Sequence, residues 1–426
     1  MTDILNIADE PIFDDRIVKI ETHSYNPFAN TTFGHSDEIR IPIQQQDLYT
    51  MPYESFLYIE GKLKIKKPTA GSDVVLQNNC VAFIFDEIRY ELDGVEIDQN
   101  RNVGITSMHK NYVTISSDRS VIMKNAGWSE PTIVDGHFNF CVPLYMLLGF
   151  CEDYRRIVIN ACHELILIRS RNDNNCLLGA STLEPVLNIF KIQWRMPHVL
   201  LSEIKKLPML RALESGRYLS MGFRSWDLYE FRLLQRTPKH SWAIKTATQL
   251  KKPRYVIFAL QTGRKNVMSE DASKFDVCKL TNVKLYLNSE CYPYDDMNLD
   301  FDKNRWSILY DTYARFCKNY YGYEYLEPSL TVSLFLHYGP FVIIDYSRQN
   351  ESVKSATVDV RLEFECKENV SNNTTAYCLI IHDRVIQYNP LTNVAQNYLS
   401  VCDNNLERGE AGYKSKCYEM VVILLN

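Results

Sequence analysis

The most constraining feature of this sequence is an alternation of apolar and charged residues with a period of two. It is clearest in the segment 356–370, where every second residue from Val358 to Phe364 is apolar and the residues between them are charged. Successive side chains of a β-strand point to opposite faces of its sheet, so the pattern predicts a strand with one buried face and one solvent face. An α-helix would scatter the same apolar side chains around its axis.

Further strands are predicted along the whole chain. Residues 56–67 predict a strand pair that turns at Gly61, and residues 82–98 predict a pair that turns at Asp93-Gly94, a dipeptide that favours tight hairpins. Many short strands divided by turn-forming residues favour a sandwich or barrel over an α/β fold. Wholly apolar runs, typical of strands buried inside a sandwich, occur at 254–261, 284–288, 340–346 and 376–388.

A break in the strand pattern near the middle of the chain predicts two domains. Residues 199–215 carry leucine and isoleucine at helical spacing, although Pro208 should kink a helix there. The 426 residues are enough for two domains of ordinary size. The predicted division is an N-terminal arm (1–15), a first sandwich (16–198), a helical linker (199–216), a second sandwich (217–390) and a C-terminal tail (391–426).

Composition narrows the class of protein. The 47 basic and 52 acidic residues give a net charge of −5, whereas proteins that mainly grip nucleic acid usually carry a basic excess. The acids Asp3, Asp9 and Glu10 and the lack of an apolar run argue against a secretory signal peptide at the start. No stretch approaches the roughly 20 apolar residues of a membrane span. The twelve cysteines contain no C-x-x-C pair, and we expect them to be reduced inside the cell.

The sequence offers no convincing catalytic or metal-binding motif. It lacks the glycine-rich loops that hold phosphates and the G-x-S-x-G nucleophile motif. His163-Glu164 begins like the zinc motif H-E-x-x-H, but the fifth position is Leu167 and the segment alternates like a strand. Asp295-Asp296 is interpreted as part of an acidic exposed loop. We therefore expect a protein that is not an enzyme, with no catalytic residue, no metal ligand and no cofactor.

Short basic clusters leave two interpretations open. Lys62, Lys64 and Lys66 alternate on one face of a predicted strand and are followed by Lys67. Lysines on an edge strand discourage one sheet from pairing with another. The same lysines could instead make a modest contact with nucleic acid phosphates.

Two long loops are predicted at 124–137 and 292–328, and the second is crowded with tyrosine and phenylalanine. Large rigid side chains dominate protein interfaces, so this loop is a candidate contact between subunits. The alternative is that its aromatic residues pack back on their own domain. The four residues that we predict at the subunit contact are Tyr294, Trp306, Tyr313 and Tyr321.

One segment, residues 138–178, resembles a known family. It contains an apolar strand, then Pro143-Leu144, then the run GFCEDY (149–154), and then a second apolar strand with His163, Arg169 and the following Asp173. This order is similar to that in the double jelly-roll major capsid proteins of Polinton/Maverick elements and adintoviruses. Further collinear matches to that family lie at 194–199, 252–264, 283–299, 341–364 and 373–388.

The resemblance implies an all-β fold of two tandem eight-stranded jelly rolls, with a short helical linker and long loops. It implies a homotrimer that forms pseudo-hexagonal capsomers of an icosahedral double-stranded DNA virus or of an endogenised virus-like element. The implied partners are neighbouring capsomers, a minor capsid or penton protein and, through weak contact, packaged DNA. The implied location is the virion capsid, after synthesis in the host cell interior.

Two other functions are weighed against this one. A host-domesticated β-sandwich module could bind carbohydrate or nucleic acid without assembling a shell. An enzyme on a jelly-roll scaffold, such as a metal-using cupin, would need a histidine cluster, and the nine histidines here are dispersed. The size of the protein in solution separates these hypotheses, because a capsid protein forms trimers or shells.

Overall fold

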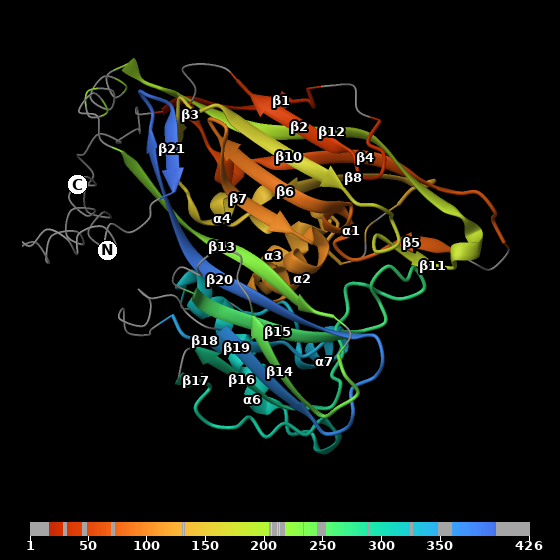
Figure 1. The fold of residues 1–426 in the computed structure, drawn as a ribbon. Helices are drawn as coiled ribbons and strands as arrows, with labels where there is room; N and C mark the ends of the chain where they lie inside the picture. Colours follow the sequence, from red (N-terminus) through yellow and green to blue (C-terminus); the bar gives the residue numbers. More distant parts are fainter. Residues whose placement is uncertain are drawn as a thin grey trace, which may run out of the picture.

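The chain forms two antiparallel β-sandwiches, the N-terminal one above and the C-terminal one below in Figure 1. The structure is a computed structural model. It describes residues 17–397 apart from 29–31, 45–48, 70–72, 130, 132, 204–205, 207–210, 212, 214–217, 233, 245–252, 288–289, 324–326 and 348–359.

The first sandwich is built from strands between residues 17 and 201. One sheet has the order β8-β4-β12-β3-β9, with β1 paired to β12, and the other has the order β2-β10-β6-β7; β5 and β11 form a separate pair. Trp194 on β12 and Tyr90 on β6 meet in the core with their ring centroids 5.6 Å apart. The strands are β1 (Ile17–Tyr25), β2 (Glu38–Ile43), β3 (Tyr49–Thr50), β4 (Phe56–Ile65), β5 (Val74–Leu76), β6 (Phe85–Leu92), β7 (Val95–Arg101), β8 (His137–Pro143), β9 (Val158–Ile159), β10 (His163–Arg169), β11 (Leu177–Gly179) and β12 (Pro185–Leu201).

The second sandwich repeats this plan. Its sheets have the orders β13-β20-β15-β18, with β21 paired to β20, and β14-β19-β16-β17. The described sheets hold six and four strands in the first sandwich and five and four in the second, more than the eight predicted for each, because short strands such as β9 and β21 extend them. The strands are β13 (Leu219–Phe231), β14 (Lys239–Ile244), β15 (Pro253–Thr262), β16 (Leu280–Leu287), β17 (Glu290–Tyr292), β18 (Val342–Asp345), β19 (Val360–Cys366), β20 (Thr374–Asn389) and β21 (Val394–Asn397).

The alternation that predicted strands is confirmed in β19. Val360, Leu362 and Phe364 are buried, whereas Arg361 is exposed. Val358, at the start of the pattern, lies outside the described residues. The four apolar runs also form strands, within β15, β16, β18 and β20.

The two predicted hairpins have different outcomes. Asp93 and Gly94 adopt positive φ angles of 49° and 76° between β6 and β7, as a tight hairpin turn requires. The turn predicted at Gly61 is wrong, because β4 continues through it and pairs with β8 on one side and β12 on the other. A Cβ at Gly61 would lie 2.5 Å from the Phe138 ring and 2.5 Å from the Asn188 carbonyl oxygen, so close packing explains this glycine. The lysines of β4 therefore do not lie on an edge strand.

Helices are more numerous than the sequence predicted. Helix α6 occupies much of the predicted loop 292–328, and the predicted linker 199–216 has helical residues at 203, 206, 211 and 213. Strand β12 runs to Leu201, so the first residues of that predicted linker are strand, and the predicted domain bounds stay a prediction. The α-helices are α1 (Cys80–Phe83), α2 (Val103–Thr114), α3 (Ser117–Ile122), α4 (Gly149–Asp153), α6 (Ser307–Tyr321) and α7 (Val332–Tyr338). The 3₁₀ helices are η2 (Pro52–Glu54), η3 (Met123–Ala126), η4 (Leu144–Met146), η5 (Ser181–Leu183) and η6 (Phe301–Lys303).

Because neighbouring strands pack closely against Gly61, adding a single methyl group there should destabilise the fold. Gly61→Ala should lower the free energy of unfolding by about 1–3 kcal/mol, because the carbonyl oxygen of Asn188 cannot move away without disturbing the β4–β12 pairing. The measurement is urea unfolding. Gly222→Ala on β13 is the matched control, since a Cβ there meets nothing within 4 Å, and it should be neutral or slightly stabilising. Equal effects of the two substitutions would contradict this explanation.

Candidate assembly site

Helix α2 is the element on which the two sandwiches meet. It follows β7 of the first sandwich, lies between the sandwiches in Figure 1, and contacts β13, β20 and α6 of the second. All twelve of its residues are buried. The last carbonyl groups of a helix need partners, and here α6 supplies them. The Tyr313 hydroxyl donates to the Tyr112 carbonyl oxygen at 3.2 Å, and the Cys317 thiol donates to that of Thr114 at 3.1 Å.

A buried ion pair lies at the centre of this contact. The Lys110 ammonium on α2 donates to Glu152 Oε1 on α4 at 2.6 Å, and the two side chains are 1% and 2% exposed. Two hydroxyls of α6 complete the carboxylate: Tyr321 donates to Oε1 at 2.7 Å and Tyr320 to Oε2 at 2.8 Å. The Lys110 ammonium also lies 4.6 Å from the centroid of the Trp226 ring on β13. Burial lowers the pKa of Lys110, and Glu152 opposes that effect.

A second ion pair joins α4 directly to β13. Arg224 donates to Asp153 through Nε at 2.7 Å, through Nη2 at 2.5 Å and through its backbone N–H at 2.9 Å. Its guanidinium lies 3.6 Å from the centroid of the Tyr320 ring and donates to the Tyr320 carbonyl oxygen at 2.8 Å. Gly149 allows this approach, since a Cβ there would lie 1.8 Å from the Arg224 carbonyl oxygen. These contacts give the GFCEDY motif a structural role in joining the sandwiches.

Asp98 on β7 makes a third connection. Its carboxylate accepts hydrogen bonds from the Phe150 backbone N–H on α4 and from the Ser225 hydroxyl on β13, each at 2.9 Å. Burial raises the pKa of Asp98 to about 6, despite these bonds and the nearby Arg384. We use the name junction for six residues: Asp98, Lys110, Glu152, Asp153, Arg224 and Tyr320.

His163 belongs to the core of the first sandwich. It is 1% exposed, its Nε2 lies 2.9 Å from Thr50 Oγ1, and its Nδ1 lies 2.7 Å from Tyr90 Oη. Burial lowers its pKa to about 3, so the ring is neutral at physiological pH. The adjacent Glu164 pairs with Arg40 on the outer face instead. Among the described residues, no three His, Cys, Asp or Glu side chains are grouped as metal ligands would be.

The four aromatic residues predicted at a subunit contact are placed differently. Tyr294 is 87% exposed and Trp306 is partly exposed. Tyr313 is fully buried against α2, and Tyr321 is partly buried and bonded to Glu152, so both contact their own chain. The subunit contact is therefore kept as a proposal for Tyr294 and Trp306 only. Helix α2, which accepts a hydrogen bond from Tyr313, escaped prediction, because it is buried on all sides and has no apolar stripe.

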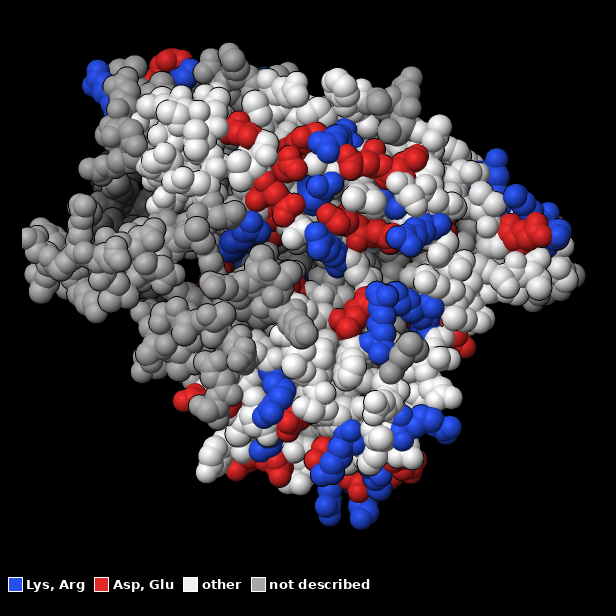
Figure 2. All heavy atoms as spheres, in the orientation of Figure 1, with Lys and Arg blue, Asp and Glu red and all other residues white. Residues whose placement is uncertain are grey.

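The outer face of the sheet β2-β10-β6-β7 carries interspersed acidic and basic side chains (Figure 2). Arg40 pairs with Glu38 at 2.6 Å, and Arg89 pairs with Glu87 at 3.2 Å. Such exposed pairs contribute little to stability. In the basic segment 62–67, Lys67 pairs with Glu184.

Exposed apolar side chains gather on β1 and α3. On β1, Ile17, Val18 and Ile20 are 43%, 62% and 50% exposed, and within the described chain this strand pairs with β12 alone. A free strand edge with apolar side chains is suited to contact with another chain. On α3, Val121 and Ile122 are 66% and 68% exposed.

Within the part of the chain that the structure describes, no helix has both the length and the apolar character needed to cross a membrane.

Comparison with known proteins identifies the family. The sequence matches the model of the double jelly roll-like domain over residues 74–386, which is most of the chain. The chain belongs to the double jelly roll-like family. This family assignment confirms the predicted fold class of two tandem jelly rolls. No curated protein sequence matches the chain.

Solved structures share the fold of this double jelly-roll chain. A chain in the structure of the Sputnik virophage has a TM-score of 0.61 and 8% identity, with 97% of this chain and 96% of that one covered. The Faustovirus major capsid protein has a TM-score of 0.57 and 9% identity, with 89% and 92% covered. The mavirus major capsid protein has a TM-score of 0.55 and 10% identity, with 97% and 96% covered. At such low identity the likeness shows the double jelly-roll fold.

Removing the central cation of the junction, the Lys110 ammonium, should lower the free energy of unfolding strongly. Lys110→Met leaves Glu152 buried with only hydroxyl donors, and breaking a buried pair in this way typically costs about 3–5 kcal/mol. Urea unfolding at pH 7 should show a loss of that size. The control is Lys239→Met, which breaks the exposed 2.7 Å pair with Glu365 and should leave stability nearly unchanged. If Lys239→Met lost as much stability as Lys110→Met, burial of the junction pair would not explain the effect.

Because the pKa of the buried His163 ring is lowered, the free energy of unfolding should depend on pH. Its pKa is about 3 in the folded chain and about 6.5 when unfolded, so below pH 6.5 the unfolded chain binds a proton that the native chain does not. This lowers the free energy of unfolding by up to about 1.4 kcal/mol per pH unit. His163→Gln should be less stable than wild type at pH 7, and the difference should shrink at pH 5. A difference that urea unfolding finds equal at both pH values contradicts the prediction.

Proposed function

We propose that this chain is a major capsid protein whose trimers form pseudo-hexagonal capsomers of an icosahedral shell around double-stranded DNA. Its family, and the fold it shares with the Faustovirus and mavirus major capsid proteins over nearly their whole length, support this proposal. The observation that carries it is the buried junction, because a junction of this kind makes one rigid block of two similar lobes. Three such blocks around a threefold axis present six lobes, which is the outline of a hexagon.

The surface suits repeated assembly rather than catalysis. A shell needs the same complementary contacts many times, and no reacting group has to be activated. The edge of β1 and the exposed Tyr294 are our candidates for contacts between copies. Trp306, which is partly exposed, is a third candidate.

The finer assignment is to a Polinton-like or adintovirus-like element, supported by the GFCEDY motif and the collinear segments after it. On this proposal the partners are neighbouring capsomers and a minor capsid or penton protein, and the protein resides in the virion capsid. Contact with packaged DNA is weak, because basic and acidic side chains are interspersed.

Light scattering coupled to size-exclusion chromatography tests the proposal. The purified full chain should have a molar mass of three times the 49.7 kDa of one chain, or should form larger shells. A stable monomer that binds an oligosaccharide or an oligonucleotide would favour the binding-module alternative instead.

A pair of variants tests the proposed contact in the same experiment. Tyr294→Ala removes a side chain that is 87% exposed and should raise the trimer dissociation constant about tenfold or more, as loss of an interface anchor does. Tyr323→Ala removes a tyrosine that is 54% exposed and was not predicted at the contact, and it should leave the trimer unchanged. Equal effects would remove Tyr294 from the interface.

A further inference from the structure

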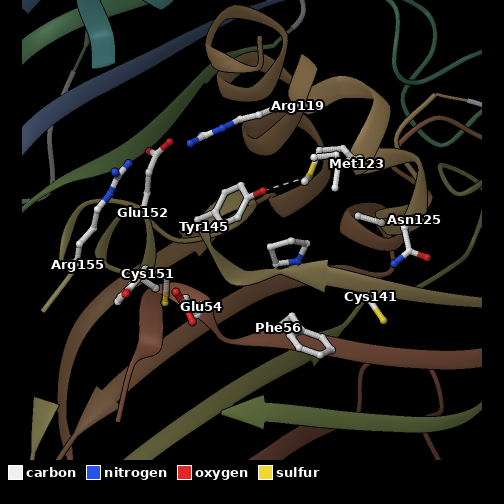
Figure 3. Close-up of a pocket in the computed structure, with 14 residues that line it drawn as sticks. Glu54, Phe56, Arg119, Met123, Asn125, Cys141, Tyr145, Cys151, Glu152 and Arg155 are labelled. Carbon is white, nitrogen blue, oxygen red and sulfur yellow. Dashed lines mark hydrogen bonds between the residues drawn. The ribbon is translucent and has the colours of Figure 1, made fainter. Parts of the chain in front are cut away.

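A pocket of about 640 Å³, which we call the α3 pocket, lies beside α3 and the strands β4 and β8 of the first jelly roll (Figure 3). Its apolar lining includes Phe56, Met123 and Pro143. The Tyr145 hydroxyl donates to Met123 Sδ at 3.4 Å, so its ring lines the pocket while its polar group is already bonded. Ile122 also lines the pocket and is 68% exposed. The volume falls within the range of about 300–1,000 Å³ typical of pockets that bind small molecules.

Positive charge is in excess at the α3 pocket. The Glu152 carboxylate at its edge is already paired with the Lys110 ammonium at 2.6 Å, so these two groups add no net charge. Of the other lining residues, Arg119 and Arg155 are cationic and Glu54 is anionic. Within the described chain, no carboxylate lies within 4 Å of either guanidinium group. The pocket therefore has one positive charge in excess and two guanidinium groups that lack an ion-pair partner there.

The cationic and apolar groups lie at different ends of the pocket. In Figure 3, the guanidinium groups of Arg119 and Arg155 lie at one end, and Phe56 and Cys141 lie at the other. The Arg119 guanidinium is 5.1 Å from the centroid of the Tyr321 ring, and this contact helps to fix its direction. A ligand that satisfies both ends needs an anionic head and an apolar body.

The chemistry of the two ends narrows the ligand further. A guanidinium group binds a carboxylate through two parallel N–H bonds, and a single excess charge suits a monoanion. A peptide would bring backbone N–H and C=O groups that need partners. At the apolar end, the only side-chain amide of the lining is that of Asn125. A hydrocarbon chain has no polar groups to satisfy, and its burial against apolar side chains is favourable.

We propose that the α3 pocket binds a fatty acid, with the carboxylate on Arg119 and Arg155 and the hydrocarbon chain along Phe56 and Met123. The exposed Ile122 then gains an apolar contact with the chain. The proposal does not depend on the capsid function, since every residue that lines the pocket belongs to the first jelly roll of one chain.

Equilibrium dialysis of the purified full chain with radiolabelled decanoate, below the concentration at which it forms micelles, tests the proposal. One molecule should bind per chain. Decanol, which has the same chain length without the charge, should displace it at least tenfold less well than unlabelled decanoate. Acetate, which has the head without the chain, should not displace it. Absence of binding, or equal displacement by decanol and decanoate, would overturn the proposal.

Three variants test the role of the guanidinium groups. Arg119→Gln and Arg155→Gln should each weaken decanoate binding about tenfold, because each removes a charge-assisted hydrogen bond to the carboxylate. Arg156→Gln is the control, since Arg156 is exposed like its neighbour Arg155 but does not line the pocket, and its affinity should equal that of wild type. Equal affinities of Arg155→Gln and Arg156→Gln would overturn the proposal.

Two cysteines report where decanoate binds. Cys141 lines the pocket and is partly exposed, whereas Cys162 is exposed and lies outside the pocket. Saturating decanoate should slow the alkylation of Cys141 by iodoacetamide several-fold and leave the rate at Cys162 unchanged, as followed by mass spectrometry of the two peptides. An unchanged rate at Cys141, or equal slowing at both cysteines, would overturn the proposal.

Discussion

The ion pair between Lys110 and Glu152 is the interaction on which the arrangement of the two jelly rolls depends. Moving two charges out of water costs several kcal/mol for each, and their attraction offsets that cost only when every remaining polar group is also bonded. Here the hydroxyls of Tyr320 and Tyr321 and the ring of Trp226 complete the site. These partners come from the second jelly roll. A different orientation of the two jelly rolls would leave Glu152 paired with Lys110 but would take away both hydroxyl donors and the Trp226 ring, so the buried charges would be incompletely bonded.

The other junction contacts further restrict the relative orientation of the two jelly rolls. The two-pronged contact of Arg224 with Asp153 sets the angle between α4 and β13, and the glycine at 149 lets the two backbones approach closely. Asp98 ties β7 to the same two elements. Flexible packing alone would tolerate many orientations, whereas bonded charges tolerate few. A subunit of fixed shape is what a shell built from many copies requires.

The sequence predicted the strands better than the contacts between them. Alternation is a local property, so the strand around Leu362 and the turn at Asp93-Gly94 could be found from neighbouring residues alone. The role of Gly61 could not be found from neighbouring residues, because it depends on a phenylalanine ring and a carbonyl group that pack against it from two other strands.

The helices at the junction show the same limit. Helix α2 is buried on all sides and carries several polar residues, so it lacks the apolar stripe that reveals a helix in a sequence. Helix α6 did carry such a signal, with buried residues at 309, 313, 316 and 320, but its many tyrosines suggested a loop. The GFCEDY motif was visible through its resemblance to a family. Its purpose became clear only with Arg224, which lies 71 residues after Asp153.

Cryo-electron microscopy of the purified full chain tests the central claim most directly, namely that the junction holds two jelly rolls as one block of a trimeric capsomer. The account predicts particles with threefold symmetry and six similar lobes, in which Arg224 and Asp153 are in contact within every subunit. Particles in which the two jelly rolls of one chain take variable orientations, or single chains without threefold partners, would contradict it.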